Sequence, residues 1–423
     1  MFKKVLSILV VLVLCCTTLV GAVSAENKTG IAKPSNTLVT NGNGGKTDVG
    51  TWFMTYLNQG WGSNFGSGYP IKFRTLMPDG SYGILDSSKV EHIDFQLKQI
   101  ADAKIDFIIY DITNGGVSDK FGMGWSGLDD NGLPTKNSIV KNAILTSQRI
   151  AEWNKNNDWK IRYCLAVGVY NQLTNGAPVG VATEYQAEGV YKYFYEQDFG
   201  GDNYYHVDGK PMLIIFDWAY PAIEDWDTYG GERTYGDKFF VRGAQEGNVG
   251  TYGWHTEEGS APHEEVIVVC PGHDTAGEGG RDTPRANGSY YKRGWETILT
   301  NMLPRIIVVT SFNDYNEQTA VWVADTSKCN PEIEEHWIDA KGNHNPAMYW
   351  NMTKEGIRLV RTFNGDVQGE FKSNIFNLGQ DAVTKGTTSN NTMLIIIIIA
   401  TAVVVIAGAL VCVLLLTKKK TKK

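Results

Sequence analysis

Short apolar runs alternate along most of the chain with stretches in which apolar residues recur every three or four positions. The runs are rich in valine, isoleucine and aromatic residues, and this composition predicts buried strands. The expected strands cover residues 49–57, 104–112, 160–169, 211–218, 265–270 and 305–312, with weaker patterns at 238–242 and 249–254. The amphipathic stretches predict helices over residues 88–103, 138–154, 183–199, 288–302 and 349–363.

Strands and helices that alternate in this order predict a parallel sheet covered by helices. A count of about eight strands predicts an α/β fold of the (β/α)8 TIM-barrel class, which we place at residues 49–375. A doubly wound open sheet is the alternative, and it would show a glycine-rich phosphate turn after an early strand. The segment Thr113–Gly116 follows the second strand and is a plain loop, so the pattern favours the barrel.

Both ends of the chain have the composition of targeting segments. Residues 1–25 carry two lysines, an apolar run and a small-residue site, which predicts a secretory signal peptide. Residues 393–416 contain no charge and are followed by lysines in 417–423, which predicts one C-terminal transmembrane helix with a basic cytoplasmic tail. A buried core helix and a lipid-anchor signal are the alternatives, and the lysines disfavour the anchor. With a flexible lead-in at 26–48 and a stalk at 376–392, we expect a single-pass protein of the cell surface whose N-terminal domain is extracellular.

The charge and the cysteines narrow the class of protein. The formal charge of −7 becomes −14 without the seven lysines of the two end segments. This acidity argues against nucleic-acid binding, which needs a basic surface. The domain keeps three cysteines, Cys164, Cys270 and Cys329, and so small an odd set is no disulfide framework and allows one bridge at most. Cys164 and Cys270 lie in apolar, strand-like runs, which favours buried free thiols there. No zinc, calcium, phosphate-loop or nucleophile-elbow motif occurs, so we expect no metal and no cofactor.

The candidate chemistry lies in residues 304–319, which read PRIIVVTSFNDYNEQT. Here an apolar strand stops at Ser311, and two carboxylates, Asp314 and Glu317, follow it three residues apart. In a (β/α)8 barrel, residues just past the C-terminal end of a strand face the active site. Two carboxylates in such a place are candidates for acid and base catalysis on a glycosidic bond. The alternative is a turn whose acids cap the next helix.

Other polar and aromatic residues stand at the same ends of the predicted strands. A closed barrel would bring them to one mouth, where carboxylates, amides and imidazoles bind hydroxyl groups and aromatic rings stack on sugar rings. For the acids the alternative is loop capping, and for the aromatic residues it is core packing. The predicted substrate-binding residues are Trp52, Tyr56, Asp111, Asp217, Trp218, Trp254, His255, His273, Asp274 and Asn313.

The segment SFNDYNEQT resembles the SFNEWHEGT-type signature of glycoside hydrolase family 99, the endo-α-mannosidases, and of related glycan-processing barrels. Residues 80–112, 210–220 and 271–299 also resemble blocks of that family. The resemblance implies a (β/α)8 barrel that cleaves internal α-mannosidic linkages with retention. It implies that Asp314 deprotonates the 2-hydroxyl of the sugar, which attacks C1, and that Glu317 is the acid and base toward the leaving oxygen and water.

Among the departures from the family pattern, Asp314 replaces a glutamate, Asn316 a histidine and Gln318 a glycine. Two alternatives stay open beside the mannosidase. One is a non-catalytic glycan-binding surface protein on the same fold, and the other is an α-1,3-glucanase similar to family 71. In each case the expected partner is an oligo- or polysaccharide, and the expected protein is a monomer held in a membrane by its C-terminal helix.

Overall fold

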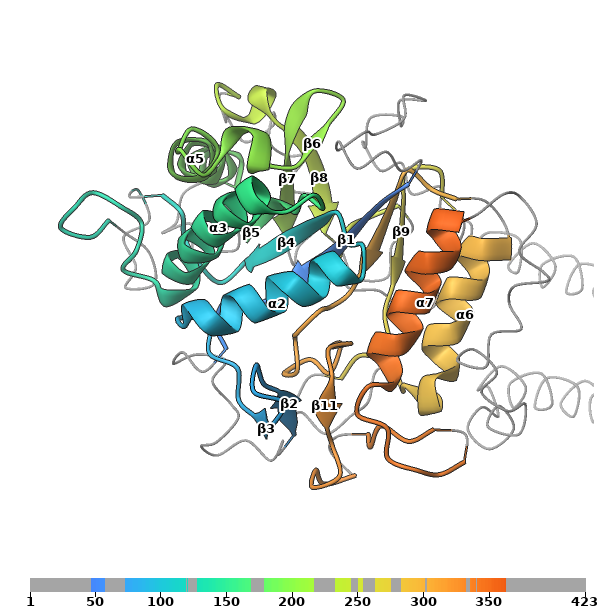
Figure 1. Ribbon diagram of the computed structural model, residues 1–423. Helices are drawn as coiled ribbons and strands as arrows, with labels where there is room; N and C mark the ends of the chain where they lie inside the picture. Colours follow the sequence, from blue (N-terminus) through green and yellow to red (C-terminus); the bar gives the residue numbers. More distant parts are fainter. Residues whose placement is uncertain are drawn as a thin grey trace, which may run out of the picture. The chain divides into compact units, whose positions relative to one another are not determined.

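The computed structural model is drawn in Figure 1, and every structural statement below concerns the residues that it describes. The described residues are 47–57, 73–118, 120, 128–168, 179–216, 233–244, 250–253, 263–274, 283–300, 303–331, 335–339 and 341–362.

A mixed sheet is the centre of the described chain. Seven of its strands are parallel and pair in the order β8-β7-β5-β4-β1-β10-β9, while the short β6 pairs antiparallel with β7. The parallel strands are nearly continuous runs of apolar residues, as expected where both faces of a sheet are buried. The strands are β1 (Asp48–Phe53), β4 (Phe107–Ile112), β5 (Arg162–Gly168), β6 (His206–Val207), β7 (Lys210–Phe216), β8 (Phe240–Ala244), β9 (Val266–Val269) and β10 (Ile306–Val309).

The prediction of a closed (β/α)8 barrel is wrong. Within the described residues β8 and β9 do not pair, so the sheet is open between them, and β6 makes it mixed. Of the strand expected at 249–254, the described residues 250–253 form no strand, and Gly250 has φ +78° there. That left-handed conformation interrupts an extended strand. The apolar pattern predicted the other seven parallel strands, but a pattern of single residues contains no information about which edges pair.

A buried ion pair lies between the two unpaired edges. Arg242 of β8 donates to both carboxylate oxygens of Glu265, at 2.6 and 2.9 Å. The hydroxyl of Tyr252, in the turn that replaces the expected strand, donates to the same carboxylate at 3.0 Å. Side-chain contacts therefore connect β8 to the start of β9 where ladder hydrogen bonds were predicted.

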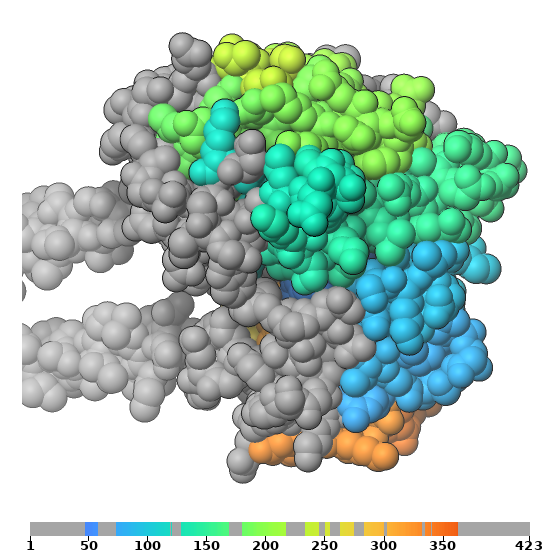
Figure 2. Space-filling model, turned by 90° about the vertical axis from the view of Figure 1, so that its left-hand side faces the viewer, coloured from blue at the N-terminus to red at the C-terminus, as the bar shows by residue number. Residues whose placement is uncertain are grey.

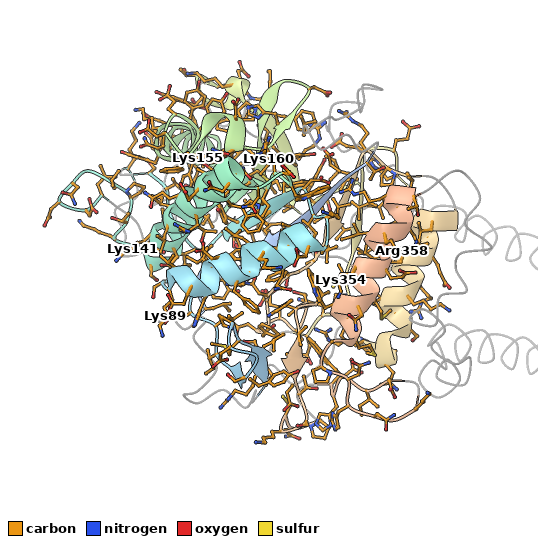
Figure 3. The ribbon with its side chains drawn as sticks, in the orientation of Figure 1. Lys89, Lys141, Lys155, Lys160, Lys354 and Arg358 are labelled. Atoms are coloured by element: carbon orange, nitrogen blue, oxygen red, sulfur yellow. The ribbon has the colours of Figure 1, made fainter. Side chains whose placement is uncertain are left out.

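Five described helices confirm the helical predictions. They are α2 (Val90–Asp102), α3 (Ser138–Asn156), α5 (Val179–Val190, continued by a π-helical turn at Tyr191–Tyr195), α6 (Ser289–Thr300) and α7 (Met348–Thr362). Each of α2, α3 and α7 buries an apolar stripe and leaves its charged residues outside. Figure 3 labels basic side chains of this outer surface: Lys89, Lys141, Lys155, Lys160, Lys354 and Arg358.

Two close contacts fix how the helices and strands pack. Figure 1 shows α6 beside α7, and a Cβ atom at Gly356 of α7 would stand 2.4 Å from the ring of Trp295 in α6. Inside the sheet, a Cβ atom at Gly50 would stand 2.3 Å from the ring of Phe107. Phe107 stacks on Tyr205 at a centroid distance of 3.8 Å. Only glycine fits at these two positions without a shift of the aromatic ring.

A small antiparallel sheet joins two distant parts of the chain. It has the order β11-β2-β3, formed by Ala324–Asp325, Arg74–Leu76 and Tyr82–Gly83. Figure 2 shows the blue segment that contains β2 and β3 near the orange segment that follows β10. This pairing holds the chain after β10 close to the chain after β1.

The predictions for the chain ends fall outside the described residues. The expected signal peptide, lead-in, stalk and transmembrane segment at 393–416 all lie there. Among the described residues, no helix has the length and apolar character needed to cross a bilayer. The predicted free thiols are confirmed, because Cys164 and Cys270 are buried and unbridged; Cys329 is buried and unbridged as well.

Candidate active site

Residues 311–319 form a loop that begins after β10, and hydrogen bonds join the first residue of this loop to the last. Ser311 donates its backbone N–H to the carbonyl of Thr319 at 2.9 Å, and the two hydroxyl groups also lie 2.9 Å apart. The hydroxyl of Ser311 accepts the backbone N–H of Asp314 at 2.8 Å. These contacts hold Asp314 and Glu317 in one compact turn.

Asp314 is the buried acid of this loop, with 1 % of its surface exposed. Its Oδ1 accepts the backbone N–H groups of Asn316 at 3.0 Å and of Glu317 at 3.2 Å. The hydroxyl of Tyr56 also hydrogen-bonds to its carboxylate. Burial, then the charges of Glu317 and Asp111, raise the pKa of Asp314 well above its usual range, although the two backbone N–H groups act the other way.

Glu317 is the solvent-exposed acid of the loop, with 39 % of its side chain exposed. Its Oε2 lies 3.6 Å from Nε2 of His273, which follows β9. Its backbone carbonyl accepts the N–H of Asp274 at 3.0 Å. The segment after β9 therefore supports Glu317 from one side.

Asp111 lies near the C-terminal end of β4 and is 6 % exposed. Its Oδ1 accepts the backbone N–H of Thr113 at 2.9 Å and its hydroxyl at 2.6 Å. Burial, with a smaller contribution from the charge of Glu317, raises the pKa of Asp111 to about 6, although the two Thr113 hydrogen bonds lower it. Asp111 and Glu317 are therefore electrostatic neighbours although they belong to different strands.

Tyr56 completes the group just beyond β1. Burial, followed by the charges of Asp314, Asp111 and Glu317, raises the pKa of its hydroxyl well above the usual value. The phenol stays protonated at neutral pH and acts as a hydrogen-bond donor. The ends of β1, β4, β9 and β10 thus bring six predicted residues together: Tyr56, Asp111, His273, Asp274, Asp314 and Glu317.

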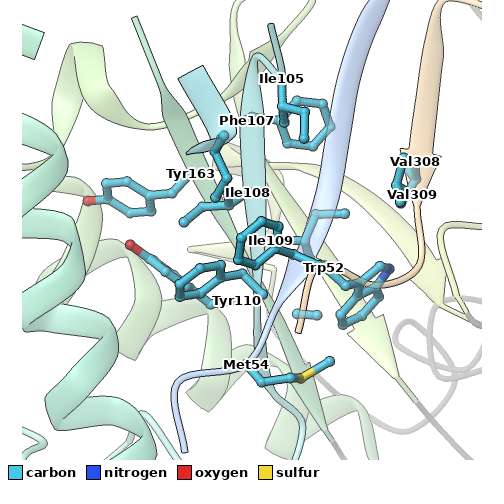
Figure 4. Close-up of a cluster of buried hydrophobic side chains, with 14 of the residues drawn as sticks. Trp52, Met54, Ile105, Phe107, Ile108, Ile109, Tyr110, Tyr163, Val308 and Val309 are labelled. Atoms are coloured by element: carbon cyan, nitrogen blue, oxygen red, sulfur yellow. The ribbon is translucent and has the colours of Figure 1, made fainter. Parts of the chain in front are cut away.

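Two other predicted binding residues have structural roles. Trp52 is fully buried, and its indole N–H donates to the carbonyl of Tyr252 at 2.7 Å. Figure 4 shows it within a cluster of buried side chains, so its faces pack in the core. Asn313 is fully buried as well, accepting the N–H of Met54 at 2.7 Å and donating to the side chain of Gln96 at 3.0 Å. It ties the loop after β10 to the end of β1 and to α2.

The remaining predicted binding residues, Asp217, Trp218, Trp254 and His255, lie outside the described residues. The described residues also contain no group of three or more histidine, cysteine, aspartate or glutamate side chains arranged to hold a metal ion.

Arg285 is a supporting residue that the sequence did not identify. Its guanidinium is buried between the rings of Trp337 and Tyr349, at 4.9 and 4.5 Å from their centroids. One of its nitrogens donates to the carbonyl oxygens of Gln318 and Ala320, at 2.5 and 2.9 Å. It therefore fixes the end of the loop next to Glu317. A single arginine before a helix gives no sequence signal for the carbonyl groups it will bind.

Gln318 has a left-handed backbone conformation. Its φ of +54° lies in the region where glycine carries no steric penalty. A glycine at this position would adopt the conformation without strain, although a glutamine occupies it.

No family model and no curated protein matches the chain. Two solved structures of the family 99 endo-α-mannosidase from Bacteroides thetaiotaomicron are similar to it in fold. One, in complex with bis-tris-propane, is 14 % identical with a TM-score of 0.49, and the other is 13 % identical with a TM-score of 0.46. Each match covers 74 % of this chain and 97 % of the other. The similarity is a distant one to a glycoside hydrolase fold, and it assigns no residue.

Proposed function

We propose that this protein is a glycoside hydrolase that cleaves α-linked glycans, with Glu317 as acid and base and Asp314 as its partner. One observation carries the proposal: two carboxyl groups of a single closed loop have opposite environments, 1 % exposed for Asp314 and 39 % for the side chain of Glu317. Glycosidases need one carboxyl group ionised and the other protonated near neutral pH, and different environments separate the two states.

Hydrogen bonds support the role of base that we propose for Asp314. Asp314 receives two backbone N–H groups and the Tyr56 hydroxyl, and donors aimed at a carboxylate favour its ionised form. Burial and the charge of Glu317 act the other way and raise the pKa of Asp314. Because like charges disfavour double ionisation, the pair retains one proton to a higher pH than an isolated aspartate would. We assign that proton to Glu317 from the signature.

The proposed reaction has two steps. Glu317 donates its proton to the glycosidic oxygen as the bond from C1 breaks, while Asp314 takes the proton of the 2-hydroxyl and the 2-oxygen bonds to C1. Water then attacks C1, losing its proton to Glu317, and Asp314 returns its proton to the 2-oxygen as that bond breaks. Two inversions at C1 give net retention, and both acids recover their starting states.

Internal α-mannosidic linkages are the substrate class implied by the signature, and α-1,3-glucan is the nearest alternative. The test incubates the purified protein with α-mannan and with α-1,3-glucan and measures released oligosaccharides. We expect release by the wild type and by Glu91→Gln, an exposed control on α2, and a loss of at least about 100-fold in Glu317→Gln. Undiminished release by Glu317→Gln would refute the assignment.

A glycan-binding protein without catalysis is the second candidate. The two backbone N–H groups that Asp314 accepts favour this candidate. A carboxylate whose role is to stabilise a turn makes the same hydrogen bonds and needs no part in catalysis. This candidate predicts that wild type and Glu317→Gln bind the glycan equally and that neither releases oligosaccharides.

A further inference from the structure

We propose that Arg285 is a positioning residue of the proposed active site, which holds the loop of residues 311–319 where Glu317 can act on the glycosidic bond. The inference rests on the proposed hydrolase function and extends it, because the two-step reaction above uses only the two loop acids. Arg285 takes no part in the bond changes and acts through the backbone that follows Glu317.

Arg285 binds the loop through backbone carbonyl groups. Its Nη2 donates to the carbonyl oxygen of Gln318 at 2.5 Å and to that of Ala320 at 2.9 Å. Gln318 directly follows Glu317 in the chain, so the first of these bonds fixes the peptide next to the solvent-exposed acid. A shift of this peptide would move the Glu317 side chain with it.

The side chain of Arg285 is itself held from several sides. It is 3 % exposed, and its guanidinium carbon lies 4.9 Å from the ring centroid of Trp337 and 4.5 Å from that of Tyr349. Its stem lies against the backbone of Gly272, where an added Cβ atom would stand 2.6 Å from Cγ of Arg285. Its backbone N–H donates to the carboxylate of Glu335. A guanidinium packed in this way gives the loop a fixed point of attachment.

The segment that carries Arg285 meets Glu317 at two further points. Nε2 of His273 lies 3.6 Å from Oε2 of Glu317, and Asp274 donates its backbone N–H to the Glu317 carbonyl at 3.0 Å. His273 and Thr283 exchange two backbone hydrogen bonds, of 2.9 and 3.0 Å, which bring the chain back toward the loop just before Arg285. One segment after β9 thus contacts the loop at the Glu317 side chain, at the Glu317 backbone and at the two carbonyl groups beyond it.

Stability alone is a poor reason for a buried arginine at this place. Nε and Nη1 of Arg285 are buried without a hydrogen bond of good geometry to any described residue. Burial of a charged group with unused donors costs stability, and local rules of this kind are broken mainly at functional sites. This use of the guanidinium fits a residue whose role is to place the loop.

Arg361 of α7 provides a matched control at the other end of the sheet. Its Nη1 and Nη2 donate to the backbone carbonyl oxygens of Thr47 at 2.7 Å and of Lys104 at 2.8 Å, which precede β1 and β4. Its guanidinium carbon lies 5.6 Å from the ring centroid of Trp159. Arg361 therefore makes the same kinds of contact as Arg285, away from the strand ends that form the candidate site.

The test measures kcat, KM and Tm of Arg285→Met and Arg361→Met on whichever of α-mannan and α-1,3-glucan the wild type cleaves, well below each Tm. For Arg285→Met we expect kcat to fall by about 10- to 100-fold with KM within about threefold of wild type, because a displaced catalytic acid acts mainly on the transition state. Arg361→Met should keep kcat within about twofold. Its Tm should nevertheless fall further, because it breaks the ion pair with the buried Asp106.

A lysine at the same position gives a rescue experiment. Arg285→Lys keeps the charge and can still donate to a loop carbonyl, but it lacks the planar fork of the guanidinium. Its kcat should therefore lie between those of Arg285→Met and the wild type. If a methionine variant does not fold, Arg285→Lys and Arg361→Lys carry the test, and kcat should fall only in the first of them.

The proposal is overturned if the folded Arg285 variants keep kcat within about twofold of wild type while Glu317→Gln is inactive. It is also overturned if the Arg361 variant loses as much kcat as its Arg285 counterpart, because the loss would then follow stability and not position. If Glu317→Gln is as active as wild type, or if the wild type cleaves neither glycan, the proposed function fails first and this inference falls with it, so the two failures are distinguishable.

Discussion

Asp48 at the start of β1 allows a sharp prediction about how stability depends on pH. Its side chain is buried, Oδ2 accepts the hydroxyl of Tyr205 at 2.8 Å, and Oδ1 has no hydrogen-bond partner. Burial, with the nearby charge of Asp106, raises its pKa to about 7, although the Tyr205 hydrogen bond, Arg361 and Arg305 lower it. The folded protein therefore binds a proton here that the unfolded chain releases at much lower pH.

The sign and size of the effect follow from this difference. Below the unfolded pKa of 3.8 the residue is neutral in both states and costs nothing, and the cost grows as pH rises until it is complete above about 7. The difference between these two values corresponds to a loss of about 4 kcal/mol in the free energy of unfolding. Asp48→Asn removes the charge and keeps an acceptor for Tyr205, but its amide group at the unpartnered position costs about 1–3 kcal/mol. We expect a net stabilisation of about 1–3 kcal/mol at pH 8 and a net destabilisation of about 1–3 kcal/mol at pH 4, where mainly the cost of the amide group remains.

Urea denaturation of wild type and Asp48→Asn at pH 4, 6 and 8 measures this directly. The difference in unfolding free energy between the two proteins should grow with pH, because all other titrating groups are common to both. Asp130→Asn, an exposed substitution, should show no such growth. A difference for Asp48→Asn that is constant with pH would refute the reasoning, and so would a variant that loses stability relative to wild type as pH rises.

Two further predictions concern packing and the unpaired edges of the sheet. Gly356→Ala should lower Tm and reduce the free energy of unfolding by about 1–3 kcal/mol, because the new methyl group meets the ring of Trp295. This loss should exceed the gain from the better helix propensity of alanine. An unchanged Tm would contradict the contact. Glu265→Leu should cost about 3–5 kcal/mol by leaving the Arg242 charge buried and unpaired, whereas Arg242→Met combined with Glu265→Leu should recover most of that loss. Urea denaturation of the two single variants and the double variant tests this, and strictly additive losses would contradict it.

Hydrophobic patterning predicted most elements of the fold but not the closure of the sheet. Seven of the expected parallel strands exist because long β-branched runs have few other stable arrangements. The run at 249–254 has a weaker pattern with two glycines, of which Gly250 takes a left-handed conformation, and Tyr252 turns inward to Glu265. Glu265 and its partner Arg242 are far from each other in the sequence, so a local pattern does not reveal this contact.

The same limit applies to the candidate site. The sequence alone predicted that Asp314 and Glu317 lie close together, because both belong to one short turn. Trp52 and Asn313 were expected to bind substrate, but one packs in the core and the other links the loop to Met54. An aromatic ring or an amide at the end of a strand is suited to either role, and only burial in the folded chain separates them. Arg285 was missed for the converse reason, since its partners are backbone carbonyl groups, which every residue possesses.

The hydrogen bonds that close the loop after β10 make its two acids parts of one unit. Because Ser311 joins Thr319 and the acids lie between them, both belong to a single turn of nine residues. Arg285 and the segment after β9 hold this turn from outside. A change at these outside contacts would therefore displace both carboxyl groups together.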